Sequence, residues 1–200
     1  MTQKPDEVTA KDSGSNFNPH PEGQFAMVCV DVVDLGYKVE SYAGQSPFES
    51  PKVALVFVSG ERHADEAKSL MLVSVEMTNS ASDKANLRKF LESWRGKSYT
   101  PEQVNAGLPL HKLAGNAALI SIEHVLTKRN KQFAKVRSVS PLPKGMPAVD
   151  EAIAGEYTRP KFLTDKKAKY AEDVAKFRGN GGEKEPELPP EQDDDDDLPF

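Results

Sequence analysis

Five segments with strand-like patterns, interrupted once by a helical pattern, limit the folds open to this 200-residue chain more than any other feature. They are rich in β-branched and other apolar side chains and lie at residues 25–35, 52–58, 69–78, 117–127 and 132–139. Short apolar segments separated by turn residues are typical of buried strands. We expect the first strand to bend at Gly36 and to resume over residues 37–42.

An apolar stripe predicts a helix between the third and fourth strands. Its residues recur at positions i, i+3, i+4 and i+7, as in one face of a helix: Leu87, Phe90, Leu91 and Trp94. We expect Ser82 to cap this helix at its start and Gly96 to end it. A second helix start is predicted at Thr100, because a proline follows directly and Gln103 stands three residues later.

The order strand–strand–strand–helix–strand–strand is typical of the OB-fold, a five-stranded barrel with its helix between strands three and four. We therefore expect a mainly β domain with one or two helices, closed as an OB-fold barrel, over residues 23–145. Another small α+β barrel has the same order of elements and remains an alternative. Residues 1–22 are expected to be disordered, residues 146–178 to form a basic extension with a helical pattern, and residues 179–200 to form a disordered acidic tail.

The net charge of -5 conceals a strong separation of charge along the chain. Residues 183–200 contain nine acids and one lysine, whereas residues 84–144 contain twelve Lys or Arg and three Glu. A basic centre favours a polyanionic ligand, and an acidic end is typical of an interaction tail. The tail is also expected to fold back onto the basic domain and compete with its ligand.

The last predicted strand has two chemically different faces, because successive side chains of a strand point to opposite sides. Its smaller side chains, which we expect in the barrel interior, are Ala134, Val136 and Ser138. The other face carries Phe133, Lys135 and Arg137. An aromatic ring beside two cations can stack on a base and neutralise phosphates, although a simple solvated strand face has a similar pattern.

Two other groups of residues are candidates for contacts with nucleic acid. The turn between the last two strands contributes Lys128, Arg129 and Lys131. The first strand, its turn and the second strand contribute Tyr37, Lys38, Tyr42, Phe48 and Lys52. OB-folds place a binding loop at this first turn.

The chain ends with an acidic run that is followed at once by apolar residues: Asp193, Asp194, Asp195, Asp196, Asp197, Leu198, Pro199 and Phe200. This segment resembles the C-terminal tip of bacterial and phage single-stranded-DNA-binding proteins. The body, including residues 87–96, resembles the OB-fold proteins of tailed phages. A solubilising role would explain the acids but not the apolar residues beside them, so we expect the segment to bind basic, apolar pockets on partners.

The resemblance implies a non-enzymatic protein that coats exposed single-stranded DNA without strong sequence preference during replication, recombination or repair. The tip would recruit other replication or recombination proteins, and the protein would act in the cytoplasm of a bacterial host cell. A homo-oligomer is compatible with the sequence. One alternative is an OB-fold adaptor or inhibitor whose acidic tail mimics DNA, and another is a nuclease or recombination enzyme with an OB module.

Residues that could support metal or catalytic chemistry are sparse. The four histidines, His20, His63, His111 and His124, lack ligand spacing, and Cys29 lies in an apolar strand. His63, Asp65 and Glu66 form a weak candidate for a metal site. We therefore expect no metal and no cofactor. No apolar run approaches the length of a membrane span, so we expect no membrane association.

Overall fold

The computed structural model describes residues 19–64, 68–126 and 132–181, and in it five antiparallel strands form one sheet. The strands are β1 (Gly23–Glu40), β2 (Phe48–Arg62), β3 (Leu70–Thr78), β4 (Ala117–Leu126) and β5 (Gln132–Ser140). All five predicted strands are confirmed. Their order across the sheet is β3-β2-β1-β4-β5, so the long β1 is the central strand and pairs with both β2 and β4.

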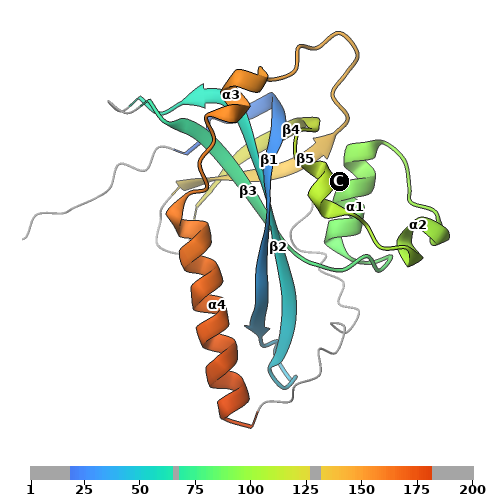
Figure 1. Cartoon of the computed structure of the whole chain (residues 1–200), viewed down its shortest axis with the longest axis vertical. Helices are drawn as coiled ribbons and strands as arrows, with labels where there is room; N and C mark the ends of the chain where they lie inside the picture. The colour runs from blue at the N-terminus through green and yellow to red at the C-terminus, as the bar shows by residue number, and fades with distance from the viewer. Residues whose placement is uncertain (1–18, 65–67, 127–131, 182–200) are drawn as a thin grey trace, which may run out of the picture.

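β1 is shared between its two neighbours and bends where it passes from one to the other. Its first residues, up to Val28, pair with β4, and from Val28 onward it pairs with β2. The register with β2 shifts twice, and the second shift lies between Asp34 and Gly36. Gly36 has a φ of 75°, which agrees with the bend predicted at this residue. Figure 1 shows the β1–β2 hairpin extending beyond the other strands.

The helices are more numerous than the one or two expected. They are α1 (Asn86–Arg95), α2 (Pro101–Asn105), a 3-10 helix η1 (Leu110–Leu113), α3 (Glu151–Gly155) and α4 (Lys161–Gly179). Gly96 ends α1 in the left-handed region, and Thr100 forms a capping box with Gln103, as predicted. The predicted cap at Ser82 is wrong: its carbonyl accepts a hydrogen bond from Ala85 in a turn, and Ala85 itself precedes the first helical residue.

The main core lies between the inner face of the sheet and α1. The predicted stripe of α1 is buried there, against inward-facing residues of β2 such as Phe57. The rings of Phe57 and Trp94 meet edge to face at 5.3 Å, and the indole Nε1 of Trp94 donates a hydrogen bond of 2.9 Å to the carbonyl of Ala117. This contact joins α1 to the start of β4.

A second core lies on the outer face of β1 and β2, under α4. Leu163 is fully buried there, and it shares an apolar cluster with Val33, Leu35, Ala54 and Val56. β2 is therefore buried on both faces, which explains its nearly continuous apolar sequence. The sequence left open whether residues 161–178 pack on the domain, bind DNA or are disordered; the structure shows that they pack (Figure 1).

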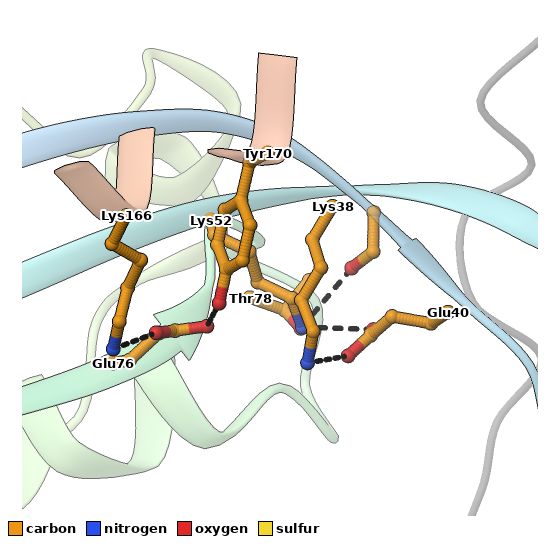
Figure 2. Close-up of polar contacts among 8 residues, drawn as sticks. Lys38, Glu40, Lys52, Glu76, Thr78, Lys166 and Tyr170 are labelled. Carbon is orange, nitrogen blue, oxygen red and sulfur yellow. Dashed lines mark hydrogen bonds and ion pairs between the residues drawn. The ribbon is translucent and has the colours of Figure 1, made fainter. Parts of the chain in front are cut away.

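Ion pairs and hydrogen bonds hold α4 along the hairpin. The carboxylate of Glu76 accepts hydrogen bonds from Lys166 Nζ at 2.9 Å and from the Tyr170 hydroxyl at 2.8 Å, as Figure 2 shows. Near the other end of α4, the Arg178 guanidinium donates two hydrogen bonds of 2.6 Å to Glu49. The basic residues of this helix thus serve partly to attach it.

Closure of the sheet into a barrel is where the fold departs from expectation. β3 and β5 are the two ends of the sheet, and in the described residues no ladder of hydrogen bonds joins them. The sheet curves so that its two edges lie near each other, but it remains open.

His20, near the N-terminus, belongs to the fold although it was expected in a disordered segment. It is 2% exposed, and its ring is 2.7 Å from the Ser59 hydroxyl.

Candidate nucleic-acid interface

A cleft of about 1120 Å³ lies between the open edges of β3 and β5. Residues of β3 line one side and residues 133–139 of β5 line another. α1 contributes Phe90 and Lys89, the segment that leads into α4 contributes Thr158 and Pro160, and the first turn of α4 contributes Phe162. His20 and His63 also line it, so the cleft is built from several separate parts of the chain.

The charge of the cleft suits an anionic ligand. Its lining includes the cations Lys89, Lys135 and Arg137. Among the described residues that line it, Glu76 is the one acid, and its charge is engaged by Lys166 and Tyr170. Burial alone would raise the pKa of Glu76, but these two hydrogen-bond donors outweigh burial and lower it. The carboxylate thus stays ionised and compensated at neutral pH.

The structure places the three predicted residues of the last strand, Phe133, Lys135 and Arg137, in this cleft. The Phe133 ring is 38% exposed, although it is a large apolar group. Arg137 Nη1 lies 2.6 Å from a carboxylate oxygen of Glu123 on β4, and its side chain remains about half exposed. A phosphate would therefore share this guanidinium with Glu123.

The predicted inner face of β5 is partly wrong. Ala134 and Val136 pack against the main core as expected, but Ser138 is exposed and Val139 is buried in its place. The cause is a bulge, because the register with β4 shifts at Arg137: Val136 pairs with Ile122 and Ser138 pairs with Ser121. One extra residue in a strand reverses the faces of all the residues after it.

The candidates on the β1–β2 hairpin do not line the cleft. Tyr37 is exposed, and Tyr42 stacks on Phe48 with ring centroids 5.6 Å apart. Lys38 Nζ lies 3.1 Å from Glu40. These residues form a separate surface near the end of the hairpin.

Lys52 is not part of any exposed surface. Its side chain is buried, and its ammonium group donates hydrogen bonds to Glu40 at 2.8 Å and to the Thr78 hydroxyl at 2.9 Å (Figure 2). Burial acts to raise the pKa of Glu40, but Lys52 and Lys38 outweigh it and lower that pKa. Lys52 therefore stabilises the hairpin, and the expectation that it contacts DNA is corrected because its ammonium group is buried and paired.

Several predicted residues lie outside the described part of the chain. Lys128, Arg129 and Lys131 belong to the connection between β4 and β5, which ends directly before Gln132 in sequence. The acidic tail with residues 193–200 also lies outside. Their roles stay predictions from the sequence.

Lys89 and Phe162 line the cleft but were not predicted. The helical spacing of Lys89 indicates only that it lies off the buried stripe of α1. Phe162 directly precedes the buried Leu163, and their adjacency on a helix indicates that one of the two faces away from the second core. Neither pattern indicates where the cleft lies, because the cleft arises from the curvature of the whole sheet.

His20 and Cys29 lie in buried environments. Burial lowers the pKa of His20, whose ring also meets the edge of Phe25 at 4.6 Å. Burial raises the pKa of Cys29 to about 12, so its thiol stays protonated and unreactive. The described residues contain no group of three His, Cys, Asp or Glu arranged to hold a metal ion, and Asp65 and Glu66 lie outside them.

Comparison with known proteins adds no relative: no protein-family model matches the chain, and no curated protein does. Within the described residues, no helix has the length and hydrophobicity that crossing a membrane requires.

Proposed function

We propose that this protein binds single-stranded DNA in the cleft between β3 and β5. One observation carries the proposal: the exposed ring of Phe133 lines the same cleft as Lys89, Lys135 and Arg137, beside an acid that is already neutralised. Aromatic rings stack on bases of any sequence, and cations follow the phosphates of the strand. The proposal therefore includes little sequence preference.

The preference for a single strand follows from the chemistry of stacking. In a duplex the base faces are covered by neighbouring base pairs, whereas in a single strand they are accessible to a ring such as Phe133. The strand order supports an OB-fold assignment, since a central β1 pairs with both β2 and β4, and α1 precedes β4. We propose the OB-fold as the architecture, with the cleft at the point where its barrel would close.

The acidic tail provides the second part of the proposal. Residues 193–200 would recruit replication or recombination proteins, with the aspartates facing basic side chains and the apolar residues entering a pocket. This proposal rests on the sequence pattern and its resemblance to phage and bacterial single-stranded-DNA-binding proteins. The proposed function involves no catalytic step. We propose that the protein acts in a bacterial host cell.

The test is a titration of the full chain with labelled oligo-dT and with a duplex of matched length across a salt series. We expect tighter binding to the single strand and a steep loss of affinity with salt, because bound phosphates release counterions. No binding of oligo-dT at low salt, or an affinity that does not respond to salt, would overturn the proposal.

A further inference from the structure

Phe162, near the start of α4, is an exposed aromatic residue in an unusual place. Its side chain is 46% exposed, whereas that of the next residue, Leu163, is fully buried in the second core. In the described part of the chain five large apolar or aromatic side chains are exposed, and two of these five, Phe133 and Phe162, line the cleft. They come from different elements, β5 and α4.

The position of Phe162 is fixed from both sides. Three residues earlier, Arg159 forms two hydrogen bonds with Asp31, at 2.7 and 2.8 Å. Directly after it, Leu163 is anchored in the second core, and Lys166 binds Glu76 one helical turn later. The backbone that carries the ring is thus fixed beside the cleft, so a ligand that stacks on the ring loses little free energy to ordering this part of the chain.

We propose that Phe162 stacks on a base of the bound strand, so that the first turn of α4 forms a second aromatic wall of the site. The inference rests on the proposed function and extends it to the C-terminal part of the chain. An apolar ligand would also contact the ring, but the cations Lys89, Lys135 and Arg137 in the same cleft favour a polyanion whose uncharged bases reach the apolar walls.

The experiment compares Phe162→Ala and Phe162→Tyr with Met146→Ala in the full chain. Met146 is a suitable control because it is also exposed and apolar but does not line the cleft. We expect Phe162→Ala to weaken oligo-dT binding about 5- to 150-fold, the range for one lost base stack. Phe162→Tyr, which keeps the ring, and Met146→Ala should bind as the unchanged protein does.

The salt dependence separates stacking from a damaged cleft. Removing a ring leaves the phosphate contacts in place, so Phe162→Ala should keep the slope of affinity against salt, whereas displacement of Lys135 and Arg137 would reduce that slope. A reduced slope would therefore overturn the stacking role. Phe162→Trp gives a second measurement: its fluorescence should be quenched by oligo-dT beyond any change seen with Trp94 alone.

The outcomes distinguish the two proposals. If the unchanged protein does not bind oligo-dT, the proposed function fails. If it binds but Phe162→Ala binds equally well, or the tryptophan at position 162 is not quenched at saturation, the role of Phe162 fails and the proposed function stands.

Discussion

Asp31 accepts both hydrogen bonds of a bidentate pair with Arg159 and a third, of 2.9 Å, from the hydroxyl of Tyr157. The two charged residues are 128 positions apart in sequence. Asp31 lies at the first register shift of β1, so the C-terminal segment is attached where the central strand bends. Tyr157 and Arg159 flank Thr158, which lines the cleft. Pro160, directly after Arg159, lines it as well.

Replacing Asp31 with Asn should loosen this attachment. The Asp31 carboxylate is mostly buried, but Arg159 is about half exposed, and solvent weakens the pair. We therefore expect a loss of about 1 kcal/mol in the free energy of unfolding, measured by urea titration at pH 7. Asp165→Asn is the control, because Asp165 pairs with Lys161 on the exposed surface of α4 and should change stability little.

The effect of Asp31→Asn should depend on pH. Hydrogen bonds from Arg159, helped by Tyr157, hold the pKa of Asp31 below its ordinary value despite burial. The stability contribution of this carboxylate is therefore present above its unfolded-state pKa of about 3.9 and is lost as the pH falls through the lower folded-state pKa. The stabilities of the two proteins should differ at pH 5–7, and the difference should shrink as the pH falls below about 3.9. A constant difference across this range would contradict the assignment.

Truncating the β5 residues of the cleft should weaken DNA binding without unfolding the protein. We expect Phe133→Ala to cost about 1–3 kcal/mol of binding free energy at constant salt slope. Lys135→Ala should instead reduce the slope of log affinity against log salt by about 0.7. Lys169→Ala is the control, because Lys169 is exposed on α4 and does not line the cleft. Equal effects at positions 135 and 169 would mean that binding depends on overall charge alone.

Removing the acidic tail, residues 183–200, should increase affinity for oligo-dT. The tail carries nine acids on a tether and would compete with DNA for the basic cleft at high effective concentration. The increase should be largest at low salt, where screening is weakest. A full-length variant with residues 193–197 changed to Asn controls for the loss of chain length. Unchanged affinity in both variants would show that the tail does not reach the site.

Lys52→Met should reduce stability and leave DNA binding unchanged. The substitution removes the buried partner of Glu40, and breaking such a pair costs on the order of 3 kcal/mol. Lys38→Ala removes the more exposed partner of the same carboxylate and should cost less than about 1 kcal/mol. Thermal unfolding and oligo-dT titration of both variants check this. If Lys52→Met folds but binds oligo-dT more weakly, Lys52 contacts DNA after all.

Gly96→Ala should destabilise the protein, whereas Gly155→Ala should not. Gly96 has a φ of 67°, and an added Cβ would lie 3.0 Å from a ring carbon of Pro141. We expect a loss of about 1–2 kcal/mol in the free energy of unfolding. Gly155 ends α3 without a positive φ and has open space around it, so alanine should be neutral or stabilise by up to about 1 kcal/mol.

The elements of the fold could largely be predicted because their patterns are local. The stripe from Leu87 to Trp94, the bend at Gly36 and the capping box at Thr100 depend on residues within one or two turns of each other. The bulge at Arg137 could not be predicted, since it depends on how β5 aligns with β4. The open edge between β3 and β5 depends on the curvature of the whole sheet.

The candidate site was predicted in part for the same reason. The alternation of Phe133, Lys135 and Arg137 is visible in one strand, and the structure brings all three to the cleft. Lys52, like these three residues, lies on a strand close to a turn in the sequence. Its burial, however, depends on Glu40 and Thr78, which come from two other strands. Phe162 becomes part of the site only through contacts of Arg159 and Leu163 with β1 and β2.

The cover that α4 provides for β2 has a consequence for biosynthesis. A ribosome releases β1 and β2 about a hundred residues before it releases Leu163. The outer apolar face around Ala54 and Val56 therefore emerges before α4 is available to cover it. Uncovered apolar sheet faces promote aggregation of nascent chains. We therefore expect a chain whose translation stops before residue 163 to aggregate more readily than the full chain, because α4 is missing from it.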